Sequence, residues 1–241
     1  MFIQNMTSRE LVQEYRSDLP EIEANNERID NSAYVSGLLK KNRKRNEVCF
    51  VRYFKTSRNN TYINLFKYIR KAESTRKTVK WDWKVWSFGL MPTFKGTCAI
   101  GFFEEASLAI VFQAHFFCRY KERLMKVCNW QTRNQLNNTK SIEDIIALYI
   151  KRNPITTWIN TKSKFGDKEH IFAPINDGVA LIQWDGENIQ ANTFITEDMY
   201  SEQQHDMVGY ARCTEQFQKE KDKLFQKLVS VMNGDKLDDK Q

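Results

Sequence analysis

Three side chains that could do chemistry recur at helical spacing in the middle of the chain. His115, Arg119 and Arg123 lie four residues apart, so on an α-helix each is only about 40° further round than the one before. Imidazole exchanges protons near neutral pH, and guanidinium groups bind phosphate through paired donors. Together these groups could cleave RNA without a metal, by helping a ribose 2′-hydroxyl to attack the adjacent phosphate. The alternative is an ordinary solvated helix face, with His115 at a strand–helix junction.

His115, Arg119 and Arg123 are expected on a helix that follows a strand. Residues 114–129 have the three-and-four spacing of an amphipathic helix, with its apolar side opposite His115, and a strand at 108–112 comes directly before it. Residues 131–140 are expected as a polar loop. A second helix follows Ser141, with Asp144 completing its cap, and ends before Pro154.

Strands are predicted on both sides of this helix pair. They are identified by β-branched and aromatic residues or by alternation of apolar and polar residues. The expected strands are 48–54, 80–86, 99–103, 108–112, 171–173, 179–184 and 189–195, with turns at 176–178 and 185–186. Residues 64–71 are expected as a short helix, and Thr196 as the cap of a helix that starts at Glu197. The fold class is therefore α+β, with a mostly antiparallel sheet packed by two central helices and helical extensions at both termini.

Four regions are expected along the chain. Residues 1–46 would form a charged helical extension, which opens with a capping box of Thr7 and Glu10 and is interrupted at Pro20. Residues 47–200 would form the α+β core, residues 201–234 a C-terminal helix, and residues 235–241 a disordered tail.

The net charge of +7 is concentrated in one segment. Residues 40–84 hold 15 basic and three acidic residues, a net charge of +12, which leaves 22 basic and 27 acidic residues elsewhere, a net charge of −5. Such a segment favours an anionic partner, above all nucleic acid, with RNA preferred to DNA. A solvated basic face is the plain alternative. The candidate nucleic-acid-binding residues are Lys40, Lys41, Arg43, Lys44, Arg45, Lys80 and Lys84.

Tryptophan and lysine alternate around Lys80 and Lys84. Trp81 and Trp83 could stack on bases while the lysines contact phosphates, as in proteins that bind single strands. The more common arrangement has the tryptophans in the core and the lysines in water.

The stretch HFFCRYKERL resembles the H-x-x-x-R helices of ribonuclease toxins in the RelE–barnase–EndoU–colicin superfamily. The resemblance covers roughly residues 115–196. It implies a helix packed on an antiparallel sheet that carries the remaining catalytic groups. His115 would then be the acid or base, Arg119 and Arg123 would bind phosphate, and Thr193 would orient the scissile phosphate. Thr196 is an alternative to Thr193, and His170 could supply the second histidine that some of these enzymes use.

Several other classes of protein are not indicated. The histidines are dispersed, His205 is expected at the surface, and there is neither a Cys-x-x-Cys pair nor a glycine-rich phosphate loop, so no metal and no cofactor is expected. The five cysteines fit reduced, buried thiols in a cytoplasmic protein. Neither a signal peptide nor an apolar stretch long enough to span a membrane is recognised.

Three functions are compatible with these patterns. The first is a metal-independent endoribonuclease-like activity centred on His115. The second is non-catalytic nucleic-acid binding by an accessory protein of a mobile element. The third is a protein-interaction module that docks a partner through its terminal helices.

Overall fold

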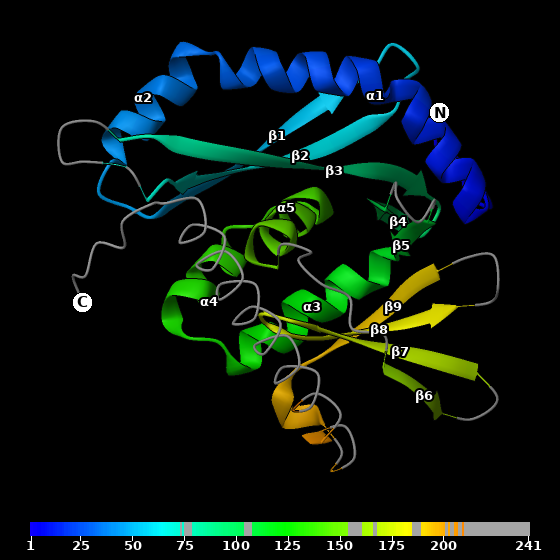
Figure 1. Ribbon diagram of the computed structural model, residues 1–241. Helices are drawn as coiled ribbons and strands as arrows, with labels where there is room; N and C mark the ends of the chain where they lie inside the picture. The colour runs from blue at the N-terminus through cyan, green and yellow to red at the C-terminus, as the bar shows by residue number, and fades with distance from the viewer. Residues whose placement is uncertain are drawn as a thin grey trace, which may run out of the picture.

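A single mixed sheet with helices on both faces organises the chain (Figure 1). The computed structural model describes residues 1–72, 74, 79–103, 108–153, 161–165, 168–184, 189–200, 202, 205, 206 and 209, with the backbone alone for 103, 161–165, 168–172 and 184. The described helices are α1 (Ser8–Asp30), α2 (Ala33–Lys41), α3 (Ala114–Val127), α4 (Trp130–Asn137), α5 (Ile142–Arg152) and the 3₁₀ turn η1 (Glu197–Met199). The described strands are β1 (Glu47–Lys55), β2 (Thr61–Arg70), β3 (Trp81–Thr93), β4 (Gly96–Phe103), β5 (Leu108–Phe112), β6 (Thr161–Phe165), β7 (Lys168–Ile175), β8 (Gly178–Trp184) and β9 (Ile189–Ile195).

The strands pair in the order β1-β2-β3-β4-β5-β9-β8-β7-β6. All the neighbouring strands are antiparallel except β5 and β9, which run parallel and join the two antiparallel halves. This confirms the predicted α+β class with a mostly antiparallel sheet.

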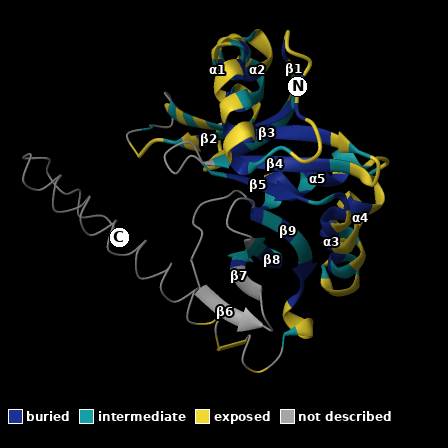
Figure 2. Cartoon of the chain, turned by 90° about the vertical axis from the view of Figure 1, so that its right-hand side faces the viewer, coloured by how far each residue is buried: buried dark blue, intermediate teal, exposed yellow. Residues whose placement is uncertain are grey.

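Alternating side chains place a core on each face of the sheet. On β5, Ile110 and Phe112 belong to the core under α3 and α5, whereas Ala109 and Val111 belong to the core under α1. A third cluster lies under α2 and includes Val35 and Phe66. Figure 2 shows exposed residues along one side of α1 and α2, above strands whose central residues are mostly buried or half-buried.

Residues 1–46 form part of this packing. Leu11, Val12 and Tyr15 of α1 are buried against the sheet. The expected capping box of Thr7 and Glu10 is confirmed, but the expected interruption at Pro20 is wrong, because α1 continues to Asp30. Packing of the buried stripe outweighs the hydrogen bond that a proline removes from a helix.

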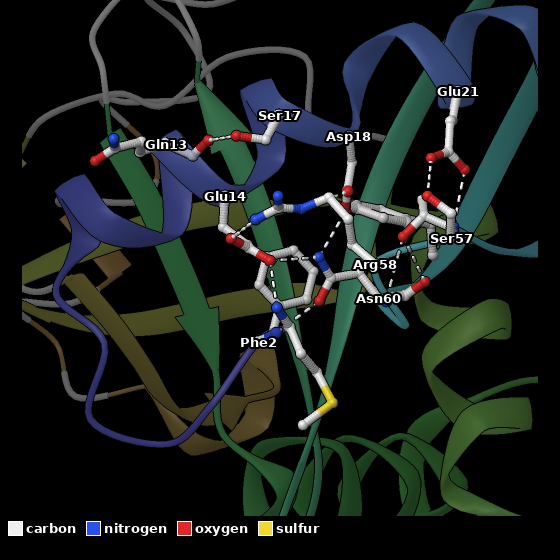
Figure 3. Close-up of polar contacts among 12 residues, drawn as sticks. Phe2, Gln13, Glu14, Ser17, Asp18, Glu21, Ser57, Arg58 and Asn60 are labelled. Carbon is white, nitrogen blue, oxygen red and sulfur yellow. Dashed lines mark hydrogen bonds and ion pairs between the residues drawn. The ribbon is translucent and has the colours of Figure 1, made fainter.

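Hydrogen bonds also fasten α1 to β2 and to the turn before it. Oδ2 of Asp18 accepts bonds from Nδ2 of Asn60 at 2.6 Å and from the Tyr62 hydroxyl at 2.7 Å. Further along the helix, the Tyr68 hydroxyl donates to Asp30 at 2.6 Å. Figure 3 shows another of these bonds, in which the Glu21 carboxylate accepts from the amide of Ser57. Asp18, Glu21 and Asp30 of α1 are therefore engaged in hydrogen bonds within the protein.

Some expected local structures differ from the observed ones. Residues 64–70, expected as part of a short helix, lie in β2. Both faces of β2 are buried, so its apolar residues run on without alternation and mimic a helix. Residues 131–137 of the expected loop lie in α4, which Asn129 caps by accepting a bond from the amide of Thr132. Thr196 precedes a 3₁₀ turn and makes no side-chain cap bond.

Other expected elements are confirmed. Strands 48–54, 99–103, 108–112 and 189–195 fall within β1, β4, β5 and β9, and the helix after Ser141 has its capping box with Asp144. Residues 163–165 and 168–169 lie in β6 and β7. The turn at 185–186, most of the expected C-terminal helix at 201–234, and the tail lie outside the described residues.

Candidate nucleic-acid interface

Two basic segments that are distant in the sequence meet at one end of the sheet. The loop after α2 reaches the end of β2, where the amide of Arg70 donates to the carbonyl of Asn46 at 2.9 Å. The amide of Lys71 in turn donates to the carbonyl of Lys80 at 3.0 Å. Both segments lie on the left of Figure 1. We call this group the basic end, and it consists of Lys40, Lys41, Arg43, Lys44, Arg45, Arg70, Lys71 and Lys80.

The charges of the basic end are turned toward solvent. Its residues are exposed except for Arg70, which is half-buried. In the described part of the chain no ion pair involves Lys40, Lys41 or residues 43–45. Other cations of the same segment are occupied, since Lys67 pairs with Glu47 at 3.0 Å and Arg58 lies 3.3 Å from Asp18. The basic end therefore holds most of the accessible charge of the segment, to which the exposed Lys55 and Lys84 add.

The tryptophans of β3 take the more common of the two expected arrangements. Trp83 stacks on Phe66 and on Tyr68, with 6.4 Å between ring centroids in each case. Trp81 packs against the same cluster under α2. Lys84 is exposed. The tryptophans are thus engaged with the core and do not form an open stacking platform.

The predicted helix face on α3 is observed, but its members differ in exposure. His115 lies in the first turn of α3 and is exposed, as is Arg119. Nη1 of Arg119 lies 4.0 Å from a carboxylate oxygen of Glu122. Arg123 is half-buried, and burial, followed by the nearby charge of Arg119, lowers the pKa of its guanidinium. The face therefore has an open N-terminal part and an enclosed C-terminal part.

Two of the candidate residues, Arg123 and Thr193, lie close together. Nη1 of Arg123 lies 3.5 Å from the Thr193 hydroxyl and also donates to the main-chain carbonyl of Phe194. The guanidinium is thus already engaged in holding β9, which gives it a structural role. Thr196 is buried, with 2% of its surface exposed, and its side chain makes no cap bond to η1.

The second histidine candidate is located by its backbone alone. His170 lies in β7, where it pairs with Ser163 of β6 and with Gln183 of β8. Its side chain lies outside the described residues. His205 is exposed, as expected, with its ring centroid 5.2 Å from that of Tyr200.

A cavity of about 410 Å³ lies elsewhere, between the N-terminal loop and the β5–β9 junction. Its lining includes none of the α3 candidates. Sequence reasoning missed it, although polar Gln113 directly after the apolar strand β5 and Gln190 at the start of β9 were available signals. The lining residues are Gln4, Asn5, Met6, Met91, Thr93, Lys95, Cys98, Val111, Gln113 and Gln190.

Metal and thiol chemistry find little support among the described residues. Within them, no three His, Cys, Asp or Glu side chains come close enough to share a metal ion. Cys98 is buried and Cys49 and Cys128 are half-buried, but Cys118 is exposed, which contradicts the expectation of a buried thiol. Burial raises the pKa of Cys49 and Cys98, so both thiols are protonated at neutral pH.

Among the helices described, none combines the length and apolar character needed to cross a membrane. Comparison of the chain with protein-family models, with curated protein sequences and with solved structures gives no match. The class of protein is therefore defined by the fold alone, as an α+β protein with a mixed sheet covered by helices on both faces.

Proposed function

We propose that this protein binds nucleic acid, RNA in preference to DNA, through the basic end. The observation that carries the proposal is the meeting of the loop after α2 with the ends of β2 and β3, which concentrates exposed ammonium and guanidinium groups. Phosphate backbones bind such clusters by releasing counterions, without needing a shaped pocket. The free thiols of the described cysteines fit a reducing compartment, and we place the activity in the cytoplasm.

The mode of binding follows from what surrounds the basic end. The tryptophans of β3 are packed into the core, so stacking on bases contributes little there. Contacts to phosphate position a strand but do not report its sequence. The protein is therefore expected to bind many sequences with similar affinity, as an accessory protein of a mobile element would.

Salt dependence tests this proposal directly. The affinity for a labelled single-stranded RNA is measured by fluorescence anisotropy at increasing salt concentration. For a single strand, six or more phosphate contacts predict a loss of affinity of about 300-fold or more between about 50 and 200 mM salt. An affinity that does not change over this range contradicts the proposal.

A second candidate is metal-independent cleavage of the bound RNA by the exposed part of α3. The contact between Arg123 and Thr193 supports it, because it holds α3 against β9, and the resemblance to ribonuclease toxins implies a helix packed on a sheet. His115 would act as acid or base, and Arg119 would stabilise the charge on the phosphate. Both groups are exposed and open to a large substrate.

The cleavage test compares variants that should leave the fold intact. Wild-type protein is incubated with RNA in the presence of a chelator, beside His115→Ala, Arg119→Ala and, as a matched surface control, Arg133→Ala. Cleavage that is lost in the first two variants and kept in the control supports this candidate. Undiminished cleavage by His115→Ala, or no cleavage by the wild type across several RNAs, removes it and leaves nucleic-acid binding in place.

A further inference from the structure

The cavity at the β5–β9 junction has the features of a binding site for a small ligand. Four segments build it, namely the N-terminal loop at residues 4–6, the β3–β4 hairpin, the end of β5 and the start of β9. It adjoins the end of β3 near Thr93, whereas the basic end adjoins the start of that strand near Trp81. The two surfaces are therefore about 40 Å apart along β3, and the cavity is a separate site.

Two glutamines give the cavity a defined pattern of donors and acceptors. Oε1 of Gln113 accepts a bond from the Cys98 thiol at 3.7 Å, and Nε2 of Gln113 donates to Oε1 of Gln190 at 3.2 Å. These bonds fix the orientation of the Gln113 amide. Within the described residues no acceptor is assigned to Nε2 of Gln190, so its two donors are available to a ligand.

Charge at the cavity favours an anion. None of the ten lining residues is acidic, and Lys95 provides an ammonium group from the β3–β4 hairpin. Nζ of Lys95 lies 5.3 Å from the centre of the Phe94 ring, which is 79% exposed. The Cys98 thiol is neutral at physiological pH and adds no opposing charge.

Apolar side chains complete the lining. Met6, Met91 and Val111 contribute the hydrophobic part of the wall. Thioethers adapt their shape and make favourable contacts with aromatic rings. The volume lies at the smaller end of the range for ligand sites, which is about 300–1,000 Å³.

We propose that this cavity binds a free nucleoside monophosphate. Amide side chains match the donor and acceptor edges of a base, as they do in base recognition. The methionines would contact the faces of the base, and Lys95 would bind the phosphate. A neutral sugar would make no use of the Lys95 charge, and an acyl chain would leave the free donors of Gln190 unsatisfied.

Calorimetric titration tests the proposal with the full chain. AMP, GMP, CMP and UMP are titrated, together with their nucleosides. At least one nucleotide should bind with a Kd below about 1 mM. Lys95→Ala should weaken the binding of that nucleotide by about tenfold and leave the binding of its nucleoside unchanged, because only the partner of the phosphate is lost. Gln113→Met should weaken the binding of the nucleotide and of its nucleoside to a similar degree.

Two matched variants serve as controls. Lys140→Ala and Gln135→Met change exposed residues of the same types outside the cavity, and they should bind like the wild type. Thermal unfolding tests whether Gln113→Met is folded. If this variant is unfolded, the result for Lys95→Ala alone decides the outcome. Absence of binding by all four nucleotides overturns the proposal, and so does nucleotide binding that Lys95→Ala leaves unchanged. RNA binding at the basic end is independent of either result.

Discussion

The Arg70 guanidinium donates a hydrogen bond to the main-chain carbonyl of Arg43, with 3.4 Å between Nη1 and the oxygen. This bond crosses from the end of β2 to the loop after α2, and the amide of Arg70 reinforces it by bonding to Asn46. The loop that carries Arg43, Lys44 and Arg45 is therefore held against the sheet. A basic loop fixed in this way presents its charges as one surface.

Substitution of Arg70 by lysine tests this role of the guanidinium. Arg70→Lys keeps the charge but loses the planar fork that reaches the Arg43 carbonyl. We expect affinity for RNA to fall about threefold at fixed salt, since loop ordering is lost while the electrostatic attraction remains. Arg133→Lys, an exposed arginine on α4, is the matched control for fluorescence anisotropy. Equal affinities of the two variants would contradict the ordering role.

Asp177 is expected to be the most costly acid to replace. Its carboxylate accepts bonds from Nε of Arg152 at 2.9 Å, from the Tyr120 hydroxyl at 2.7 Å and from Nδ2 of Asn153 at 2.9 Å. Burial raises the pKa of this carboxyl, but the bonds from Arg152 and Tyr120 outweigh it and lower the pKa overall. Asp177→Asn leaves Arg152 without its counter-charge and should reduce the free energy of unfolding by about 3 kcal/mol.

Chemical unfolding at pH 7 measures this loss. Asp198→Asn changes an exposed acid of η1 and should alter the free energy of unfolding by less than about 0.5 kcal/mol. A similar small effect for Asp177→Asn would show that the Arg152–Asp177 pair contributes little to stability.

Protonation of Glu14 should lower the stability of the protein in acid. Burial raises the pKa of this carboxyl, but bonds from the N-terminal ammonium, Asn60 and Arg58 lower it from 4.5 to about 2. Because the folded-state pKa is the lower one, the stabilisation is fully present above about pH 4.5 and is lost as the pH falls toward 2. Figure 3 shows the carboxylate among these donors.

The variant Glu14→Gln should be less stable than the wild type at pH 7 by about 2 kcal/mol. Its free energy of unfolding should also depend less on pH below 4.5, so the two proteins converge in acid. Urea unfolding across this pH range makes the comparison. Parallel curves for the two proteins would show that Glu14 is not the titrating group.

Local patterns in the sequence predicted much of the fold. The period-2 alternation around Trp81 and the capping box of Ser141 with Asp144 each mark structure that neighbouring residues determine, and both were confirmed. Prediction was wrong for residues 64–71 because β2 is buried on both faces and has no polar side to mark it. Burial on two faces depends on distant elements, which a local pattern does not contain.

The candidate sites were predictable to different degrees. The basic loop was evident from composition, but its meeting with Arg70 and Lys71 depends on the pairing of β1 with β2. Thr193 was named as a candidate only through a resemblance, and its contact with Arg123 was not predicted. The cavity was not predicted, because its lining comes from four segments that only the folded sheet brings together.

The central claim is that the basic end binds nucleic acid. The most direct test compares two variants that each lose five positive charges, using the affinity for one labelled RNA at fixed salt. One variant replaces Lys40, Lys41, Arg43, Lys44 and Arg45 by glutamine. The other replaces five exposed bases outside the basic end by glutamine, namely Arg9, Lys55, Arg133, Lys140 and Lys151.

The two variants have the same net charge, so a difference in affinity reports the location of the binding surface. We predict a loss of about 100-fold or more for the basic-end variant and of less than about fivefold for the control. Equal losses in the two variants would contradict the account, because general electrostatic attraction would then explain the binding.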